Sequence, residues 1–509
     1  MTSMTGRQRM PLLGSRSFAG RALRVLGLVL LGVGLSHCKG DPDGVDAGVD
    51  ASVDVGETPD AGWDAGPRVQ TLMQDVNLLD VDAQQRWLAA AQRDDGGTVA
   101  QDLATGETRR IAPAADRGAF SSDGRVLVLT RSPGGGNTAW LWRAGDAEAS
   151  VMGTQILSNV VLKEGATPYA AFLEGTATGG SELRRVFPQA CDGGTCQVET
   201  LAQVEAEWAE PAGISVGERF LWLRGTRATW AFDTELGTLT EIERGFNNLV
   251  RVSQSGNRFA RLTSERHLLM YETRTQALLW EVVVPPSDKE LREVSFLDED
   301  TVIVGRANDL GTHPRENSVA CTSRGCESLG DTLCRSRSMG GATVLFCSAT
   351  VCSGVTPCER SYDLMRSPGV TLSHLEGAID LEPTLSDDLS TAAWMTYEVS
   401  NPAGSRTLIR ERGMTSQWLA FPRKIDMTVF SFVPGQQRFV FVNPKQDANG
   451  GVENVLSLWD EAGVEEVGVV EGTPVHPLFR TSPPALYLNA SQPASDGGAD
   501  VRILQRFAL

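Results

Sequence analysis

Cysteine is the residue type whose number and spacing point most directly to chemistry in this chain of 509 residues. One cysteine, Cys38, stands alone near the N-terminus, and the other eight lie further along. These eight are Cys191, Cys196, Cys321, Cys326, Cys334, Cys347, Cys352 and Cys358. A thiol can carry a lipid, form a disulfide or bind zinc as a thiolate. The residues around each cysteine indicate which of these roles it has.

The segment before Cys38 has the pattern of an export signal. The first 24 residues hold five arginines and no acidic residue, and an apolar run of 11 residues, 25–35, follows. A charged start followed by a short hydrophobic core is typical of a signal peptide. A membrane-spanning helix needs about 20 apolar residues, so this run is too short to be one. The sequence therefore predicts a signal peptide over residues 1–37.

The four residues Leu35-Ser36-His37-Cys38 resemble the lipobox of bacterial lipoproteins, whose cysteine is lipidated and becomes the new N-terminus. Leu35 is the residue expected at its position, whereas His37 stands where that family has a small residue. The resemblance implies a lipid on Cys38, a membrane anchor and a place in the bacterial cell envelope, in the periplasm or on the outer-membrane surface. Ordinary signal-peptidase cleavage, or an uncleaved tether, is the alternative.

Residues 38–67 follow as a segment rich in Asp, Gly and Ala. Such a composition buries too little apolar surface to offset chain entropy, so we expect a disordered spacer. Asp41 and Asp43 match the start of a calcium-binding loop, but Val45 breaks the pattern, and no metal site is predicted.

The charge balance excludes one class of partner. The chain holds 64 acidic and 46 basic residues, for a net charge of -18 at pH 7. Nucleic acids are bound through clustered lysines and arginines, and no basic stripe occurs. We therefore expect no nucleic-acid partner.

The eight later cysteines are an even number in an exported, oxidising context, which predicts four disulfides. Three pairs each flank a turn of four or five residues, where facing positions of a hairpin can be bridged. These are Cys191 with Cys196, Cys321 with Cys326, and Cys352 with Cys358. Cys334 and Cys347 would then close a fourth hairpin.

Spacing alone leaves two alternatives open. Cys347 could instead pair with Cys352, and Cys334 with Cys358. A zinc site is the functional alternative, since four thiolates can surround zinc as a tetrahedron. Its ligands would be Cys191, Cys196, Cys321 and Cys326.

Residues 68–509 repeat a unit of four short strands. A strand, a polar turn and an apolar strand, as in 118–131 and 430–443, alternate with a second hairpin, as in 228–242 and 456–470. The units recur every 38 to 53 residues, the period of propeller blades. No amphipathic helix pattern interrupts them. The sequence predicts an all-β fold, a β-propeller of four-stranded blades.

The stretch FSSDGRVLVLTR is similar to the S-x-D-G turn of TolB-type and WD40-like propeller repeats, and QDLATGETRRI carries a D-x-x-T-G turn common in propeller blades. The last unit holds three strands, and residues 68–76 can supply the fourth and close the ring. Counting gives nine units and a split tenth, within a range of 8–10. Propellers of the resembled families mostly have roughly six to eight blades. Irregular units or two rings are therefore alternatives.

Several motifs in the sequence are of catalytic or cofactor type. The stretch GISVG places Ser215 in a G-x-S-x-G pattern, but a strand follows where a nucleophile elbow requires a helix. Trp280 lies where quinoprotein propeller repeats have their docking tryptophan, yet the rest of that turn differs. Trp280, Trp142 and Trp459 are therefore assigned to packing between blades. No cofactor, metal or catalytic residue is predicted.

The histidines after the signal peptide are widely separated, and none has the spacing of a metal site. They are His267, His313, His374 and His476.

Two functions remain. The first is a non-enzymatic propeller scaffold, anchored by Cys38, that binds a protein or glycan partner in the envelope. The alternative is an envelope hydrolase or lyase with a site in the central channel. Convergent acids or histidines with shifted pKa values would favour the enzyme, and a broad loop face would favour the scaffold.

Overall fold

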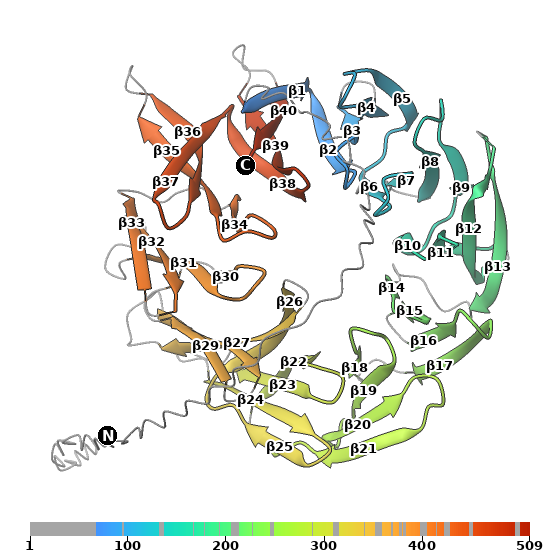
Figure 1. The fold of residues 1–509 in the computed structure, drawn as a ribbon. Coiled ribbons are helices and arrows are strands. Elements are labelled where there is room, and N and C mark those ends of the chain that lie inside the picture. The colour runs from blue at the N-terminus through green and yellow to red at the C-terminus, as the bar shows by residue number, and fades with distance from the viewer. Residues whose placement is uncertain are drawn as a thin grey trace, which may run out of the picture. The chain divides into compact units, whose positions relative to one another are not determined.

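The computed structural model describes residues 68–509 apart from several short stretches. These stretches are 94–95, 132–136, 166, 178, 193, 205–212, 226–227, 245–248, 288, 309–314, 340–341, 352–358, 368–369, 376–378, 380–382, 398–404, 414, 422–427, 447–450 and 494–498. The described residues form 40 strands and no helix, and so contain no helix that could cross a membrane. The strands make ten four-stranded antiparallel sheets, here called blades (Figure 1).

The first five blades follow the chain, each from its innermost to its outermost strand. Blade 1 consists of β2 (Val76–Val81), β3 (Trp87–Gln92), β4 (Gly97–Asp102) and β5 (Thr108–Pro113). Blade 2 consists of β6 (Arg117–Phe120), β7 (Val126–Arg131), β8 (Thr138–Arg143) and β9 (Ser150–Gly153). Blade 3 consists of β10 (Val161–Lys163), β11 (Tyr169–Gly175), β12 (Ser181–Cys191) and β13 (Cys196–Val204). Blade 4 consists of β14 (Gly213–Val216), β15 (Phe220–Arg224), β16 (Ala228–Asp233) and β17 (Thr238–Arg244). Blade 5 consists of β18 (Leu249–Val252), β19 (Arg258–Leu262), β20 (His267–Glu272) and β21 (Leu278–Val283).

The remaining blades continue the pattern, except that the last one takes its outer strand from the start of the described chain. Blade 6 consists of β22 (Glu290–Phe296), β23 (Val302–Asn308), β24 (Arg315–Thr322) and β25 (Gly325–Ser328). Blade 7 consists of β26 (Leu333–Met339), β27 (Ala342–Val351), β28 (Glu359–Ser367) and β29 (Val370–Leu375). Blade 8 consists of β30 (Thr384–Leu385), β31 (Thr391–Tyr397), β32 (Arg406–Arg412) and β33 (Thr415–Phe421). Blade 9 consists of β34 (Phe430–Phe432), β35 (Phe439–Gln446), β36 (Val452–Trp459) and β37 (Val464–Val470). Blade 10 consists of β38 (Thr473–Thr481), β39 (Pro484–Gln492), β40 (Val501–Ala508) and β1 (Val69–Gln74).

The S-x-D-G turn has a local hydrogen-bond pattern that explains its recurrence. Ser121 Oγ donates to Asp123 Oδ1 at 2.6 Å and accepts from the backbone N–H of Val126 at 3.0 Å. Gly124 has a φ of 68°, a conformation that glycine adopts without steric cost. Ser386 and Asp388 repeat the bond at 2.6 Å in blade 8. Each turn fixes the register between an inner strand and the apolar strand after it.

The second strand of a blade reads as a continuous apolar run because blades cover both of its faces. In β3 the first five residues are buried, and in β7 the first four. The outer strand β17 has only one buried residue, since it borders solvent.

A hydrophobic cluster lies at each of the ten joints between neighbouring blades. At the joint between blades 1 and 2, the rings of Trp87 and Trp142 meet edge to face, with centroids 5.1 Å apart. At the joint between blades 10 and 1, Tyr487 packs with Val76 and Leu88. The propeller fold is thus confirmed with ten blades in one ring, and the expectations of irregular extra units or two rings are wrong.

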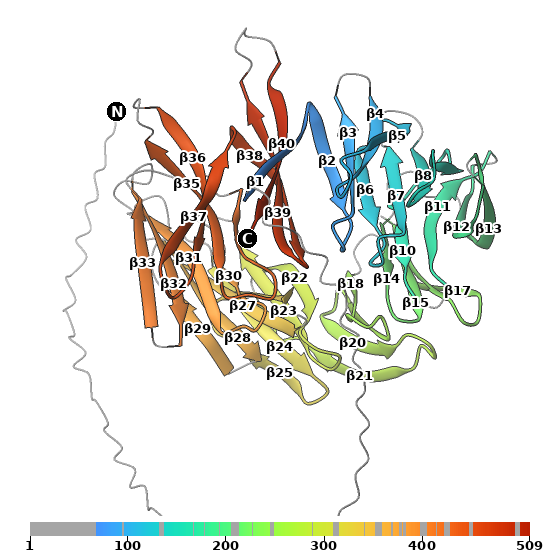
Figure 2. The same ribbon diagram turned by 45° about the horizontal axis from the view of Figure 1, so that its top comes forward.

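The ring closes through β1, as the sequence predicts. β1 pairs antiparallel with β40, with Val69 opposite Phe507 (Figure 2). Polar contacts reinforce the joint to blade 1. Asn489 Nδ2 donates to the carbonyl of Val76 at 3.0 Å, and Arg480 Nε donates to the carbonyl of Val81 at 2.7 Å.

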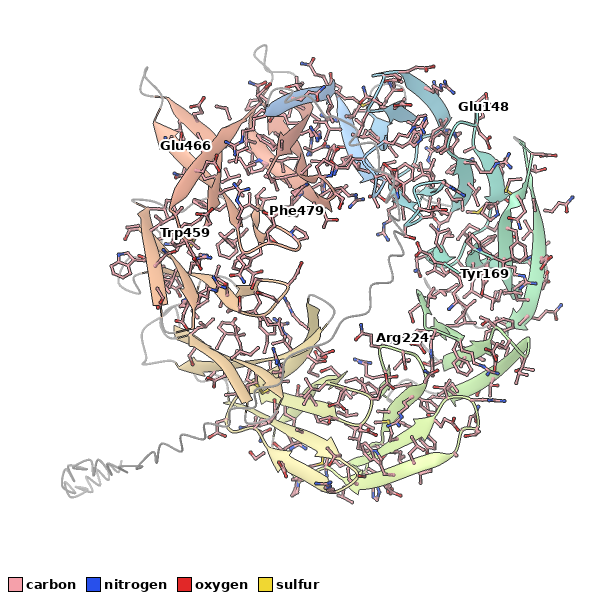
Figure 3. All side chains as sticks on the ribbon, in the orientation of Figure 1. Glu148, Tyr169, Arg224, Trp459, Glu466 and Phe479 are labelled. Atoms are coloured by element: carbon pink, nitrogen blue, oxygen red, sulfur yellow. A yellow bond between two sulfur atoms is a disulfide. The ribbon has the colours of Figure 1, made fainter. Side chains whose placement is uncertain are left out.

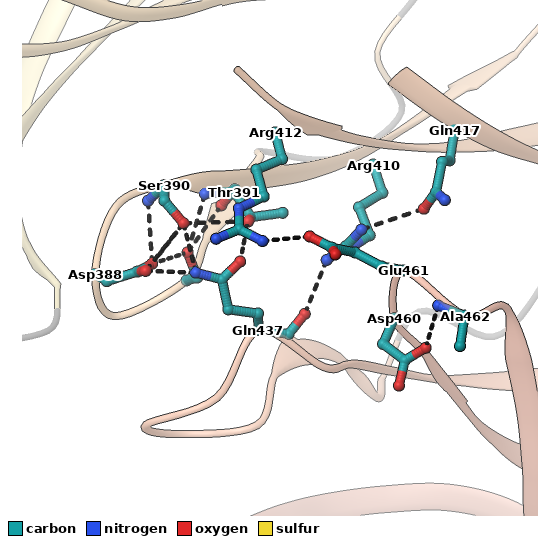
Figure 4. Close-up of polar contacts among 11 residues, drawn as sticks. Asp388, Ser390, Thr391, Arg410, Arg412, Gln417, Gln437, Asp460, Glu461 and Ala462 are labelled. Carbon is teal, nitrogen blue, oxygen red and sulfur yellow. Dashed lines mark hydrogen bonds and ion pairs between the residues drawn. The ribbon is translucent and has the colours of Figure 1, made fainter. Parts of the chain in front are cut away.

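Polar side chains also connect blades 8 and 9 (Figure 4). Gln437, in the turn before β35, accepts from Thr391 Oγ1 at 2.7 Å through its side-chain oxygen and donates to Asp388. Arg410 Nη2 donates to the backbone carbonyl of the same Gln437 at 3.2 Å. Arg412 forms an ion pair with Glu461 at the edge of this joint.

Candidate binding site at the inner edge of the ring

The innermost strand of each blade faces the centre of the ring. Figure 3 shows the side chains of Arg224 and Phe479 at this inner edge, whereas Glu148 and Glu466 lie on the outside. Residues at the inner edge come from blades that are distant in sequence. A ligand at the inner edge could therefore contact several blades at once.

A hollow of about 690 Å³ opens at the inner edge where blades 5, 6 and 7 meet. Its charged lining residues are Arg251, Glu293, Asp298, Glu299 and Arg366. β18 and the turn after it supply one wall, β22 the second, and β26 with the nearby ends of β27 and β28 the third. The volume suits a ligand of small-molecule size or one protruding side chain with its neighbours.

Arg251 is a partly buried charged residue of this hollow. Burial lowers the pKa of Arg251, the nearby Arg224 lowers it further, and Glu293 partly offsets both. Arg251 Nη1 donates to the carbonyl of Val250 at 3.1 Å. Arginine stays protonated despite such shifts. The hollow therefore presents a partly desolvated positive charge next to a carboxylate.

Two other acids of the hollow, Asp298 and Glu299, accept hydrogen bonds from backbone N–H groups. Asp298 Oδ1 accepts from the backbone N–H groups of Asp300 at 2.8 Å and Thr301 at 2.7 Å, which builds the turn between β22 and β23. Glu299 Oε1 accepts from the N–H of Ser255 at 3.4 Å, across the joint to blade 5. Ser295 Oγ accepts from the N–H of Ser336, across the joint to blade 7.

The described residues that line this hollow include no histidine and no cysteine. In the described part of the chain, no group of three or more His, Cys, Asp or Glu side chains could hold a metal.

Asp82, in blade 1, is an acid whose pKa burial raises, despite hydrogen bonds from Trp87 and Arg86 that lower it. It caps the turn between β2 and β3, accepting these two N–H groups at 2.8 and 2.7 Å. The hollow at the inner edge can bind charged groups through Arg251, Glu293 and Arg366.

The structure leaves Ser215 without a catalytic setting. It lies in β14, opposite Trp222 in β15, so a strand stands where the nucleophile elbow needs a helix. The tryptophans have packing roles. Trp142 and Trp459 are buried at joints between blades, and Trp280 is partly buried against the cluster between blades 5 and 6.

The three histidines that the structure describes lie in different blades. His267 starts β20 and contacts Glu281 on the neighbouring β21. His374 lies in β29, and His476 lies in β38 at the joint of blades 10 and 1. His313 falls outside the described residues.

Three disulfides join facing residues of paired strands. Cys191 bonds Cys196 across β12 and β13, Cys321 bonds Cys326 across β24 and β25, and Cys334 bonds Cys347 across β26 and β27. The structure thus contains the hairpin pairing of Cys334 and neither the rival pairing nor a thiolate zinc site. Cys352 and Cys358 lie outside the described residues, as do Cys38 and the whole of 1–67.

Sequence reasoning missed Arg251, Glu293 and Arg366. A usable signal was present for Arg251, because it lies between Val250 and Val252 in a short inner strand. A charge at such a position faces the inner edge or a joint. What the repeat pattern could not show was that these three residues border one hollow.

No protein-family model matches the chain, and no curated protein matches it. Several solved structures do match it. The chain resembles dipeptidyl peptidase 4 of Porphyromonas gingivalis (10% identity, TM-score 0.42), covering 83% of this chain and 65% of that one. It also resembles the tricorn protease (10% identity, TM-score 0.27), covering 82% of this chain and 47% of that one. A third similar structure is the WD40 domain of SCAP from fission yeast (7% identity, TM-score 0.34), covering 86% of this chain and 98% of that one.

These likenesses are too distant to carry any activity to this chain, and the chain spans only about half of the tricorn protease and about two thirds of the peptidase. The assignment of the fold class rests on the sheets of this chain. Ten four-stranded antiparallel blades, closed by the N-terminal strand, define a ten-bladed β-propeller.

Proposed function

We propose that this protein is a non-enzymatic binding scaffold of the bacterial cell envelope, anchored by a lipid on Cys38. Its propeller holds a protein or glycan partner through the hollow at the inner edge of blades 5, 6 and 7. The spacer of residues 39–67 separates the propeller from the membrane. Roughly 29 residues of random coil would span about 30 Å.

One observation carries the binding role. The hollow of about 690 Å³ is walled by three blades and presents Arg251, Arg366 and Glu293 beside the hydroxyls of Ser295 and Ser336. Sites for ligands are concave surfaces with a few placed polar groups. Charged groups of both signs around hydroxyls can recognise a zwitterionic peptide surface or a sugar that carries charge.

The scaffold is favoured over a hydrolase or lyase by how the acids are used. Asp298 and Glu299 accept hydrogen bonds from backbone N–H groups that build turns and joints. An acid–base pair needs two groups that are available to substrate and have separated pKa values. Among the acids of the described lining, Glu293 is the one that accepts no backbone N–H bond of this kind, and one carboxylate does not form an acid–base pair.

The binding role can be tested by site-directed photo-crosslinking in intact envelopes. A photoreactive amino acid replaces Ser336, which lines the hollow, and in a control replaces Glu466, which lies on the outside of the ring. The scaffold predicts a discrete adduct from position 336 that is absent from position 466. The double substitution Arg251→Ala and Arg366→Ala should abolish that adduct.

Mass spectrometry would identify a protein adduct, and glycan arrays probed with the purified chain would cover a glycan partner. An adduct pattern equal at both positions, with no glycan bound, would contradict the proposed site. Turnover of a glycan or peptide by the purified chain, lost in the same double variant, would replace the scaffold with the enzyme.

The anchor has a separate test. Cys38→Ala should release the processed chain from membranes into the soluble fraction, because the acyl chains supply the attachment. His37→Ala places a small residue before the cysteine, as the lipoprotein family has, and should keep the chain membrane-bound. Membrane pelleting of a cleaved Cys38→Ala product would refute the lipid anchor.

A further inference from the structure

A second, smaller hollow of about 240 Å³ lies between blades 5 and 6. It opens beside the connection from β21 to β22 and the turn from β19 to β20, whereas the larger hollow borders the turns that follow β18 and β22. Three cationic residues line it, namely Arg266, Lys289 and Arg306. The hydroxyl residues Thr263, Ser264 and Ser287 complete its polar lining, and none of its described lining residues is acidic.

Arg306 is the unusual member of this lining. It lies in β23 and is only 6% exposed. Burial lowers the pKa of Arg306, and the neighbouring charge of Arg266 lowers it further. No carboxylate within the described ranges contributes to that shift or forms an ion pair with Arg306. A guanidinium has five N–H donors and stays charged, so this buried cation lines the hollow with no carboxylate among the described lining residues.

A second buried arginine, Arg410, has hydrogen-bond acceptors that the protein itself supplies. Arg410 is 3% exposed, and its two terminal nitrogens donate to Gln417 Oε1 at 3.1 Å and to the carbonyl of Gln437 at 3.2 Å. Acidic charges of Glu461 and Asp460 also act on it. Arg306 has the same degree of burial, but its lining neighbours add positive charge instead.

The other two cations come from the loops that border the hollow. Arg266 is exposed in the turn between β19 and β20, where its φ is 68°. Lys289 lies just before β22, with a side chain only 10% exposed and an Nζ 3.8 Å from the fully exposed Asp331. The charge of Arg266 acts on Arg306, and Lys289 brings a further positive charge to the same lining.

We infer that this hollow, formed by Arg306, Arg266 and Lys289, is a binding site for an oxyanion: a carboxylate, sulfate or phosphate group. A guanidinium pairs with such groups through two parallel N–H···O bonds, and the hydroxyls of Thr263, Ser264 and Ser287 offer further donors. A buried cation is costly unless it is paired, and a bound anion supplies the missing partner. The small volume admits the anionic group itself or the end of a larger ligand.

The test is thermal unfolding of the full chain in Tris chloride, with chloride replaced by phosphate, sulfate or acetate at constant ionic strength. An anion bound only to the folded state raises Tm saturably, by about 1–3 °C at concentrations well above Kd. Phosphate and sulfate acting without acetate would indicate a tetrahedral dianion as the ligand group. A matching rise in acetate would indicate a carboxylate.

Arg306→Met removes the charge at nearly constant shape. We expect this variant to melt in chloride at the wild-type temperature or higher, because a desolvated charge is gone, and to lose the anion-dependent rise. Arg410→Met is the matched control, a buried arginine at a distant joint. It should melt lower in chloride and keep the full anion-dependent rise.

Arg266→Gln changes an exposed turn residue and tests the site without touching the core, since glutamine also occupies positive φ at positions 85 and 276. It should weaken the anion response by several-fold in apparent affinity. The inference is overturned if the wild-type Tm in all three anions equals that in chloride, or if Arg306→Met retains the response. The experiment needs no partner, so its outcome is independent of the proposed scaffold role.

Discussion

Arg410 Nη2 in β32 donates to the backbone carbonyl of Gln437 at 3.2 Å, and through this bond a buried charge of blade 8 holds the first turn of blade 9. The same guanidinium donates to Gln417 Oε1 at 3.1 Å within its own blade (Figure 4). One side chain therefore fixes the position of a neighbouring blade and the outer strand of its own.

The Arg410–Gln437 bond predicts that Arg410→Met destabilises the propeller by about 1–2 kcal/mol, because two charge-assisted hydrogen bonds are lost from a buried joint. Urea unfolding would measure this difference. Arg412→Met is the control, since its ion pair with Glu461 is exposed and should contribute less than about 1 kcal/mol. Equal effects of the two substitutions would show that burial of the Arg410 bond has no energetic role.

The Arg219–Asp233 pair in blade 4 predicts a pH-dependent contribution. Burial alone would raise the pKa of Asp233, but hydrogen bonds from Arg219 and the N–H groups of Leu236 and Glu235 outweigh it and hold the pKa below its usual value. A carboxyl group with a lowered folded pKa stabilises the protein above its unfolded pKa of about 3.9, and this stability is lost as the pH falls through the folded pKa.

Asp233→Asn should therefore lower the free energy of unfolding by about 2 kcal/mol at pH 7, and the difference from wild type should shrink below about pH 4. Urea titrations between pH 7 and pH 2.5 would follow it. Glu235→Gln, which removes the 66% exposed second partner of Arg219, should change stability little. A constant Asp233→Asn deficit across this range would be inconsistent with the linkage.

The three disulfides predict unequal contributions to stability. Cys334–Cys347 closes a separation of 13 residues and Cys321–Cys326 one of 5. On the chain-entropy estimate, removing the pairs by double Cys→Ala substitution should cost about 3 and about 2 kcal/mol. Urea unfolding of each double variant would compare them. Alkylation of Cys334 or Cys347 in denatured, unreduced protein would show instead that the pair is open.

The closure by β1 predicts a strong effect of one short truncation. A chain that begins at Asp75 lacks β1 and exposes the edge of β40, whereas a chain that begins at Arg68 keeps the pairing. We expect the shorter chain to melt at least about 5 °C lower and to aggregate more readily. Calorimetry and light scattering would measure both. Identical melting curves for the two chains would mean that β1 does not hold the ring closed.

The repeat pattern was readable in the sequence because each blade encodes its turns locally. Ser121 and Asp123, or Ser386 and Asp388, form their bonds within a few residues, so their spacing is visible without any tertiary information. The missing strand of the last unit likewise pointed to residues 68–76. The number of blades in one ring was less accessible, because closure depends on the angle between sheets at every joint.

The hollow with Arg306 and the pairing of Cys334 could not be predicted from the sequence, for a related reason. Arg306 looks in the sequence like any charged residue in a strand, and only the packing of blade 5 against blade 6 shows that it is buried beside Arg266. Spacing could not choose between the pairings of Cys334, because the choice depends on the register of β26 against β27. In both cases the deciding partner comes from a strand that the local pattern cannot place.

The pairing of Val69 with Phe507 also sets an order of events. β1 is the first described strand to be synthesised, yet its partner β40 is the last described strand. The hydrogen bond from Asn489 to the carbonyl of Val76 joins residues 413 apart, so it too can form only after Asn489 has been synthesised. The interior blades can form hairpin by hairpin as the chain emerges, since their contacts are local. The ring itself stays open, with two unsatisfied edges, until β40 has been synthesised and β1 pairs with it.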